Sequence, residues 1–481
     1  MIKTSKIVSG IKWTAIQFVF DFIFRFSIRL ILATILLPKD FGLVGMCMVF
    51  IAVSGAASEL GMSAALIQKK NDEEAEEMYS TAFWSGLLWG LGIFLLLSFV
   101  IGPFAASFYE EPMLNILIPV LSLGILIKPF SLIHTVILTR NMDFKSLATI
   151  LNISALIAGV FSITGAYMFD LGVWALIANS LLTVILSLPL LFIKTKWKPK
   201  LEWNKLHFKN IFGFGAYSSG TVMFSTLTYN IDNLMIGKLL GSSLLGAYAL
   251  SFSLTEQFRQ AISGILNKVM YPVYGKSQDN KDKLKGYFLQ IININAILIY
   301  PIMTFLLFFA EEIIIGFFGE KWIESIIPLK ILAIGMMVHL LVNSFTSLIR
   351  GLGKPKLEMK IIMSLTIFVL IPGLYLGITN YGLTGAAFAI LLNKVCLAVV
   401  GLFVLNREIG VSLLNVYQSV KGAIYSILIS SLVVFLVEKY VYDNSIYLFG
   451  AFILTYLLLI YKFEKKNINA VISNLIEKNI N

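Results

Sequence analysis

The stretch LGVWALIANSLLTVILSLPLLFIKTKWKPK, residues 171–200, contains the two features that decide the fold of this chain. Residues 171–193 carry no charged side chain, and a helix needs about 20 consecutive apolar residues to cross the hydrocarbon core of a bilayer. Residues 194–200 include four lysines, and lysine and arginine are concentrated in the cytoplasmic loops of membrane proteins. The stretch therefore predicts a membrane-spanning helix that ends at a cytoplasmic segment.

Apolar runs of similar length recur along the whole chain. The sequence is 58% hydrophobic and only 14% charged, with a mean hydropathy of +0.85, whereas a soluble domain carries about 25% charged residues. The runs are too long and continuous for membrane β-strands, which alternate in character over about 10 residues. We predict an all-α polytopic membrane protein with about 14 transmembrane helices. They lie near residues 11–37, 41–67, 80–107, 113–139, 147–169, 171–193, 210–237, 243–270, 286–310, 325–349, 357–378, 382–405, 418–437 and 441–461.

The distribution of basic residues predicts the orientation of these helices. With the N-terminus inside, the inward segments hold 28 of the 38 lysines and arginines, whereas the outward loops hold only Lys39, Lys238, Lys321 and Lys439. This asymmetry places both termini and the segment 194–209 in the cytoplasm. It also explains the formal charge of +11, which in a soluble protein would have indicated nucleic-acid binding. We therefore expect membrane lipids, and no nucleic acid, as partners.

A weak internal repeat predicts two lobes of six helices each. Gly172 and Gly382 are 210 residues apart, and each begins a predicted helix after a short outward turn. The segment LLPKDFG at 36–42 also resembles LLGSSLLG at 239–246, at an offset of 203 to 204. Because each lobe has an even number of helices, the two repeats would have the same orientation in the membrane.

The repeat and the basic segment together predict the domain organisation. We expect an N-lobe of six spans (1–193), a cytoplasmic basic linker (194–209), a C-lobe of six spans (210–405), two additional spans (406–462) and a cytoplasmic amphipathic tail (463–481). Apolar residues recur in the tail at helical spacing, which favours a helix lying on the membrane surface. A solvated tail without fixed structure is the alternative.

Three ionisable residues of the first predicted span are candidate site residues. Asp21, Arg25 and Arg29 follow one another at intervals of four residues, so they lie on one face of a helix. Ionisable side chains inside a membrane are costly and mark functional sites. We predict that this face is a polar wall of a cavity. The alternative is that Asp21 pairs with Arg25 only to hold helices together, while Arg29 extends towards the surface.

Further charged side chains inside predicted spans extend the candidate site. Glu256 and Arg259 are three residues apart and can pair locally, and Asp232 lies near the outer end of its span, where a hydrated helix end explains it. All ten groups, Lys330 included, sum to a charge of +2, which would favour an anionic solute such as a diphosphate or an acidic sugar. The candidates for substrate binding are Arg25, Arg29, Lys128, Arg259 and Lys394, and the candidates for ion coupling or ion pairing are Asp21, Glu59, Asp232 and Glu256.

Enzyme signatures are missing from the sequence. It has no GxxxxGKS/T phosphate-binding loop, no HExxH zinc motif and no Cys/His metal spacing, so we predict no cofactor, no metal and no catalytic residue. The two cysteines, Cys47 and Cys396, lie in apolar runs and provide no disulfide framework. His134 and His339 also lie in apolar runs, where a packing role with satisfied hydrogen bonds is expected. Transport is the predicted class of function.

Five segments resemble the polysaccharide biosynthesis and export family, the Wzx-like flippases of lipid-linked oligosaccharides. They are GIKW at 10–13, LPKDFGLV at 37–44, ELGMSAALIQ at 59–68, TAFW at 81–84 and NIDNLMIG at 230–237. The resemblance covers most of the chain and is strongest over about the first 85 residues. It is closest to the branch that includes colanic-acid and teichuronic-acid exporters.

This resemblance implies an architecture and an activity. The family belongs to the multidrug/oligosaccharidyl-lipid/polysaccharide superfamily, whose members have two six-helix lobes around a central cavity, with two further C-terminal helices in the flippase branch. The implied activity moves an undecaprenyl-diphosphate-linked repeat unit across the bacterial cytoplasmic membrane by alternating access, without nucleotide hydrolysis. Polysaccharide polymerase and chain-length proteins are further implied partners.

Two rival functions are weighed against export. A multidrug antiporter of the same superfamily usually has twelve spans and binds cations, which the last two spans and the basic surplus disfavour. A membrane polysaccharide polymerase or glycosyltransferase needs an outward domain for its chemistry, whereas the outward loops of this chain are short. Export of a lipid-linked oligosaccharide is therefore the predicted function.

Overall fold

The computed structural model describes residues 13, 20–58, 61–68, 72–440 and 445–477. For some of the helical residues, Asp21 and 466–477 among them, only the backbone is described. Every regular element in these ranges is helical. The chain divides into two compact units, Met1–Leu250 and Ser251–Asn481.

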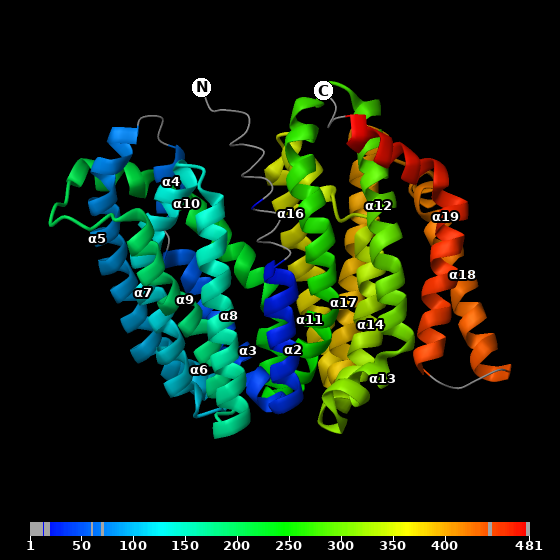
Figure 1. Ribbon diagram of the computed structural model, residues 1–481, viewed down its shortest axis with the longest axis horizontal. Helices are drawn as coiled ribbons and strands as arrows, with labels where there is room; N and C mark the ends of the chain where they lie inside the picture. The colour runs from blue at the N-terminus through cyan, green and yellow to red at the C-terminus, as the bar shows by residue number, and fades with distance from the viewer. Residues whose placement is uncertain (1–12, 14–19, 59–60, 69–71, 441–444, 478–481) are drawn as a thin grey trace. The chain divides into compact units, whose positions relative to one another are not determined.

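Helices α2 to α10 lie in the first unit, and the long helix α11 crosses from it into the second unit (Figure 1). α7, α8 and α9 pack against one another, and α5 packs along α7. A π-helical turn over Asp21–Arg25 precedes α2, and another over Leu97–Ile101 joins α5 to α6. The bounds are α2 Phe26–Ile35, α3 Pro38–Ser58, α4 Met62–Gln68, α5 Asp72–Leu96, α6 Gly102–Tyr109, α7 Leu114–Arg140, α8 Phe144–Phe169, α9 Val173–Thr195, α10 Lys205–Tyr229 and α11 Ile231–Lys276.

Helices α12 to α19 form the second unit together with the C-terminal part of α11. α14 packs along both α12 and α17. Short irregular turns interrupt this unit at Ile314–Phe318, Glu320–Ser325 and Thr366–Leu370. The bounds are α12 Lys281–Phe308, α13 Ala310–Ile313, α14 Ile326–Leu340, α15 Phe345–Gly351, α16 Pro355–Leu365, α17 Ile371–Ile409, α18 Leu413–Tyr440 and α19 Ser445–Glu477.

Eleven segments of the described residues are long and apolar enough to cross a membrane. One of them, Pro355–Ile409, is 55 residues long and is bent at Gly382, so it contains the two predicted spans 357–378 and 382–405. The first predicted span, 11–37, lies partly outside the described residues. The prediction of an all-α polytopic membrane protein is confirmed.

The predicted span 210–237 is interrupted in the structure. α10 ends at Tyr229, and the side-chain Nδ2 of Asn230 donates to the main-chain oxygen of Thr226 at 2.7 Å. An amide side chain that bonds to the main chain competes with the helical hydrogen-bond pattern. α11 then begins at Ile231 and is bent at Gly241, where φ is +82°. The bend coincides with the predicted outward turn, whereas the break at Asn230 leaves no trace in the hydropathy.

Gly172 and Gly382 adopt nearly the same backbone conformation, as the internal repeat predicts. Their φ and ψ angles are 54° and −130° before α9, and 57° and −138° within α17. A residue with a side chain would be strained in this region of φ and ψ. The two positions therefore share a backbone conformation, while the internal repeat and the division into lobes at 194–209 remain predictions.

α3 and α11 approach each other through two reciprocal glycine contacts. A Cβ atom added to Gly42 would lie 1.7 Å from the main-chain oxygen of Ser242, and one added to Gly246 would lie 1.8 Å from that of Pro38. Residues 38 and 42 correspond to 242 and 246 at the repeat offset of 204. Small residues let membrane helices pack closely. The two repeat segments therefore pack against each other as a locally symmetric pair.

Small side chains also form the buried face of α8. Ile28 of α2 packs into the space above Gly159, where an added Cβ would lie 2.1 Å from the Ile28 Cδ1 atom. Interfaces of this kind bring membrane helices together by van der Waals packing, since lipid tails remove the hydrophobic driving force. The small buried residues of α8 are Ala148, Ser154, Ala155, Ala158, Gly159, Ser162, Gly165 and Ala166.

The N-terminus of α8 is fixed by Asp143, which lies just before the membrane-spanning segment. Its Oδ1 accepts from the main-chain N–H of Ser146 at 3.1 Å, and its Oδ2 lies 3.2 Å from Lys194 Nζ. Burial raises the pKa of Asp143, but the hydrogen bonds from Ser146 and Lys194 outweigh it, so the pKa lies below its ordinary value. The carboxylate caps α8 in its charged form.

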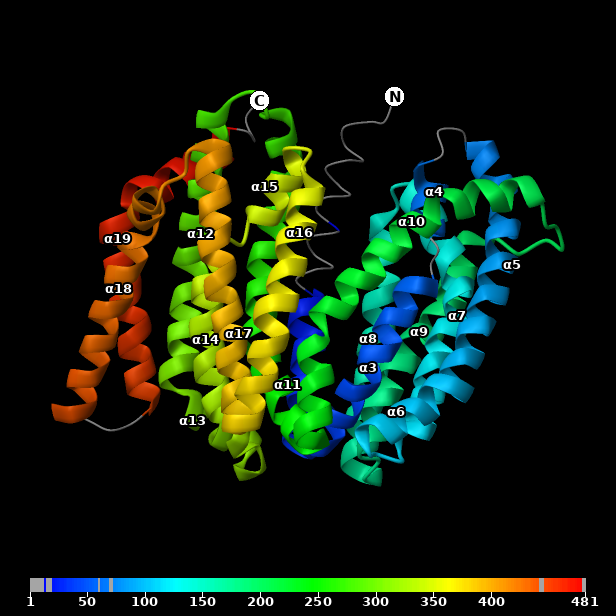
Figure 2. The same cartoon turned by 180° about the vertical axis from the view of Figure 1, so that it is seen from behind.

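α18 and α19 form a hairpin beside α12 (Figures 1 and 2). The buried carboxylate of Glu464 accepts from Asn293 Nδ2 of α12 at 3.1 Å, and the same amide donates to the main-chain oxygen of Ser419 at 2.6 Å. Tyr456 Oη donates to Ile297 O at 2.8 Å. The two spans predicted after residue 406 therefore belong to the second unit and pack against α12 within it. The backbone of α19 is helical to Glu477, so the helix extends into the predicted tail, 463–481. The side chains from residue 466 onwards are not among those that the structure describes.

Candidate functional site

The apolar segment Glu320–Gly351 contains a break inside the second unit. α14 ends at Leu340 and α15 begins at Phe345. Between them the chain turns, with Val342 N donating to His339 O at 3.1 Å and Phe345 N to Val342 O at 2.9 Å. Non-helical backbone at membrane depth is tolerated where it is buried in protein or lines a cavity, and discontinuous helices form the binding sites of many transporters. The break is therefore a candidate site.

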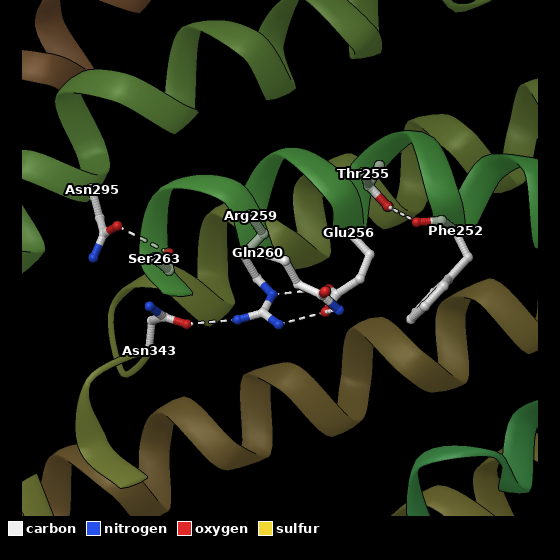
Figure 3. Close-up of polar contacts among 8 residues, drawn as sticks. All are labelled: Phe252, Thr255, Glu256, Arg259, Gln260, Ser263, Asn295 and Asn343. Carbon is white, nitrogen blue, oxygen red and sulfur yellow. Dashed lines mark hydrogen bonds and ion pairs between the residues drawn. The ribbon is translucent and has the colours of Figure 1, made fainter. Parts of the chain in front are cut away.

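Arg259 of α11 connects this break to an ion pair (Figure 3). Its Nε donates to Glu256 Oε2 at 2.8 Å, and its Nη2 forms a second contact with Glu256 Oε1. On the other side, Nη1 donates to Asn343 Oδ1 at 2.9 Å. Gln260 Nε2 also donates to Glu256 Oε1, at 2.9 Å. The guanidinium group is thus held between a carboxylate on its own helix and an amide at the break in the neighbouring segment.

Lys394 of α17 adds a second cation to this cluster. It is close enough to interact electrostatically with Glu256, and both Lys394 and Arg259 interact with His339. With His339 neutral, the charged groups Arg259, Lys394 and Glu256 carry a net charge of +1. The side chains of Glu256 and Arg259 are 15% and 19% exposed, so they are not sealed inside the protein. We call Glu256, Arg259, His339, Asn343 and Lys394 the Arg259 cluster.

Two polar atoms of the Arg259 cluster have no hydrogen-bond partner among the described residues. They are Asn343 Nδ2 and His339 Nδ1, both buried. Buried polar atoms are normally satisfied by protein, water or ligand. The expectation of a satisfied packing role stays a prediction for His339, whose Nδ1 has no partner among the described residues. For His134 this expectation is met at one ring nitrogen: Nδ1 bonds Thr195 Oγ1 at 2.5 Å, and the ring packs against Trp197. Its Nε2 has no partner among the described residues.

The N–H groups of Arg259 that bind Glu256 can also bind another anion. A guanidinium group presents its N–H donors in a planar fork that fits two oxygens of a carboxylate or of a phosphate equally well. Glu256 occupies this fork in the structure. An incoming phosphate can take the place of Glu256, and the released carboxylate is then free to bind a proton or another cation.

The structure describes only some of the candidate residues that the sequence analysis named in the first two predicted spans. Arg25 is exposed on the π-helical turn before α2, and Arg29 is half-buried on α2. The side chain of Asp21 and the whole of Glu59 lie outside the described residues. The pairing of Asp21 with Arg25 and the polar wall remain predictions.

Lys128 and Asp232 lie in surroundings that the sequence did not foresee. Lys128 lines a cavity of about 10 Å³ with Met62, Phe83 and Pro129, which is room for about one water molecule. Asp232 is buried and accepts from Tyr248 Oη at 2.5 Å. Asp232 lies in the first turn of α11, as the interpretation of a helix end predicts, but it is buried there and not hydrated.

Asn343 is the site residue that sequence reasoning missed. It carries no charge, so the search for charged groups inside spans passed over it. The pair Asn343-Ser344 in an apolar run was the available signal, because such side chains compete with helical hydrogen bonds. Ser344 Oγ contacts Asn267 Oδ1 at 2.9 Å and fixes the turn against α11.

The sequence matches the family of polysaccharide biosynthesis proteins over residues 31–327. It is 26% identical over 359 residues to the teichuronic acid biosynthesis protein TuaB of Bacillus subtilis strain 168, covering 74% of this chain and 73% of TuaB. It is 24% identical over 408 residues to the lipopolysaccharide biosynthesis protein WzxC of Escherichia coli strain K12, covering 84% of this chain and 82% of WzxC.

Among solved structures, the fold is similar to that of the lipid II flippase MurJ, with a TM-score of 0.72, 16% identity, and coverage of 96% of this chain and 100% of MurJ. It is also similar to a multidrug resistance MATE transporter of the MOP superfamily, with a TM-score of 0.64, 17% identity, and coverage of 82% and 94%. These likenesses show the fold. The match over residues 31–327 shows that the chain belongs to the polysaccharide biosynthesis protein family.

Proposed function

We propose that this protein translocates undecaprenyl-diphosphate-linked oligosaccharide repeat units across the bacterial cytoplasmic membrane by alternating access. The observation that carries the proposal is the Arg259 cluster, whose charged groups have a net positive charge. Its guanidinium group can bind two oxygens at once and contacts Asn343 at the break between α14 and α15, inside a membrane-spanning segment. Such a site matches the charge and the geometry of a diphosphate.

In this proposal Arg259 exchanges partners during transport. In the empty protein it pairs with Glu256, which avoids an isolated charge within the membrane. When the substrate enters, its diphosphate takes the two N–H groups that Glu256 occupies, and Lys394 adds charge without imposing a geometry. Glu256 then binds the coupling cation, and the return of Arg259 to Glu256 resets the site. No step requires an enzyme activity or a cofactor.

Arg25 and Arg29 take part in the same transfer. Because they lie in the first span, they offer the substrate basic side chains on the first unit as well. Asp21 pairs with Arg25 while no substrate is bound. Arg29 is half-buried, and burial of a guanidinium group within a membrane-spanning segment is costly, which favours contact with an anion. The names of the relatives TuaB and WzxC, which refer to teichuronic acid and lipopolysaccharide biosynthesis, support a substrate from the synthesis of a surface polysaccharide.

A chromosomal deletion tests this proposal against multidrug efflux. Cells without the gene should accumulate the lipid-linked repeat unit on the cytoplasmic side, lose the corresponding surface polysaccharide and keep their resistance to cationic drugs. A plasmid copy should restore the polysaccharide, and a copy with Arg259→Ala should not. Normal polysaccharide together with increased drug sensitivity would favour the multidrug antiporter. An intact linked unit that reaches the outer side but is no longer polymerised would favour a polymerase.

A further inference from the structure

The segment between α9 and α10 is held against α5 by four polar contacts. We call residues 196–204 the strap. Its Lys200 oxygen accepts from Trp84 Nε1 at 2.8 Å, and its Lys200 N–H donates to Ser80 Oγ at 3.2 Å. Trp203 Nε1 donates to Ser85 Oγ at 3.0 Å, and Asn204 N to Thr81 Oγ1 at 3.1 Å. Figure 2 shows the strap beside α5 at the end where α10 begins.

The strap has a well-packed base. Trp197 packs edge-on against Tyr79 and Phe83, with ring centroids 6.3 Å and 6.0 Å apart. Asn204 Oδ1 accepts from Leu206 N at 2.8 Å and thereby caps α10. Side chains carried by the strap are therefore positioned by fixed structure on both sides.

A cavity of about 1270 Å³ lies between the strap, the beginning of α5 and the end of α7. Pockets for a single small molecule occupy about 300–1,000 Å³, so this one has room for a larger, elongated ligand. It lies within the first unit and is separate from the Arg259 cluster. None of the proposed transport steps uses it.

The lining of this cavity has no net charge. Its acidic groups are Glu76, Glu77 and Glu202, and its basic groups are Arg140, Lys196 and Lys200. A site for an anion or a nucleic acid would be dominated by basic groups. A balanced set of donors and acceptors instead suits a ligand with many hydroxyl groups, each of which both donates and accepts.

Trp203 provides the flat surface that such a ligand requires. It lines the cavity and is 52% exposed, while its indole N–H is bound to Ser85 and its ring packs against Phe208 at 5.8 Å. The negative face of an aromatic ring attracts weakly positive C–H edges, and sugar rings present several C–H bonds on one side. The indole thus has a fixed orientation and an accessible surface.

We infer that the strap cavity binds hydroxyl-rich sugar residues of the lipid-linked oligosaccharide, stacking one sugar ring on Trp203, before the diphosphate moves to the Arg259 cluster. This inference rests on the proposed function and deepens it. On the predicted topology the strap faces the cytoplasm, the side from which the repeat unit is taken. The site therefore selects the glycan by shape and hydroxyl pattern, whereas the cluster recognises the diphosphate.

Membrane anchoring is the competing role for the strap. Tryptophan is enriched at membrane interfaces, and Leu206, which is 64% exposed and does not line the cavity, is a neighbouring apolar group. The two roles differ in what they require at position 203. Anchoring needs apolar bulk, so leucine would replace Trp203, whereas stacking needs a flat ring, so phenylalanine would replace it and leucine would not.

The test uses the full-length protein in proteoliposomes with lipid-linked oligosaccharides extracted from cells that make the polysaccharide. Trp203→Leu should raise the KM for translocation by about fivefold to tenfold with little change in the maximal rate. Trp203→Phe and Leu206→Ala should keep the KM of the unmutated protein. An unchanged KM in Trp203→Leu, or an equal rise in Leu206→Ala, would overturn the inference. The amount of folded protein and its thermal stability are measured for each variant.

A binding measurement separates this inference from the proposed function. Glycans released from the same lipid by mild acid are titrated into detergent-purified protein, and binding is followed by tryptophan fluorescence and by calorimetry. Binding to the unmutated protein and to Trp203→Phe, with at least about fivefold weaker binding to Trp203→Leu, supports the site even if no translocation occurs. Translocation by the unmutated protein without any binding of the released glycans contradicts the site and leaves the proposed function intact.

Discussion

The chemistry of single residues in the proposed site depends on how Arg259 is held. Its guanidinium group bonds Glu256 through Nε and Nη2 and Asn343 through Nη1. Two of these N–H groups form the same fork that a phosphate would use. Lysine at this position would keep the charge but lose the fork.

Arg259→Lys should therefore lower translocation per folded molecule by about tenfold while leaving the amount of folded protein nearly unchanged. Arg259→Ala leaves Glu256 without its bidentate partner, and breaking a buried pair costs about 3–5 kcal/mol, so this variant should also lower the protein level. The double variant Glu256→Gln with Arg259→Gln should restore the level but not translocation. Translocation that recovers in the double variant would show that the pair has only a structural role.

Arg25 and Arg29 have a parallel test in the first unit. Arg→Lys at either position should impair glycan export per folded molecule, and Arg→Ala should impair it more, by about tenfold. Arg407→Ala serves as the matched control, because Arg407 is exposed at the end of α17. Export at the level of the unmutated protein in both alanine variants would remove Arg25 and Arg29 from the site.

The charged members of the site could be read from the sequence, but their surroundings could not. Arg259 and Glu256 are visible because charges inside apolar runs are rare, and their spacing predicts the pair that the structure contains. The hydrogen bond between Arg259 and Asn343 and the one between Tyr248 and Asp232 depend on tertiary packing and on the direction of the side chains. Those contacts join residues up to 84 positions apart, which periodicity does not report.

At the scale of helices, three kinds of position organise the structure: bends, breaks, and glycines at which two helices pack closely. Gly172 and Gly382 share one conformation at equivalent points of the repeat. The break between α14 and α15 positions Asn343. Apolar length and charge predicted where most helices lie, whereas the breaks at Asn230 and Asn343 did not alter the hydropathy and were missed. At Asn230 the side chain bonds the main chain, whereas at Asn343 it accepts a hydrogen bond from the distant Arg259 side chain.

The contact between α3 and α11 makes a specific prediction about Gly42. An alanine Cβ would overlap the main-chain oxygen of Ser242, and a main-chain atom cannot move aside without shifting its helix. We expect Gly42→Ala to destabilise the protein by at least about 1–3 kcal/mol, measured as a lower thermal unfolding temperature in detergent. Gly55→Ala, on the same helix with no atom near the added Cβ, should be neutral or slightly stabilising. Equal stability of the two variants would contradict the close packing.

At the scale of the whole molecule, the apolar helices and the family match establish a polytopic membrane protein of the polysaccharide biosynthesis protein family. The sequence predicted this class because 14% charged residues are too few to cover a water-soluble surface. Its orientation in the membrane rests on the distribution of lysine and arginine alone.

Cysteine labelling checks this orientation. In a background without Cys47 and Cys396, single cysteines at Lys198, Ala470 and Glu320 are treated in intact cells with a membrane-impermeant thiol reagent. The cysteine at 320 should react, while those at 198 and 470 should react only after the membrane is opened. Labelling at 198 or 470 in intact cells would reverse the predicted topology and place the strap on the outer side.

The most direct test of lipid-linked oligosaccharide translocation is a leaflet-accessibility measurement on purified protein. Vesicles are prepared with the lipid-linked oligosaccharide, and a membrane-impermeant reagent that oxidises the glycan is added outside. Protein-free vesicles should show oxidation of the outer leaflet only, whereas vesicles with the protein should expose the remaining fraction at a rate proportional to the number of molecules. Vesicles with Arg259→Ala should behave like protein-free vesicles. A rate equal to that of protein-free vesicles, from correctly folded protein that still moves a cationic dye, would contradict the proposed function.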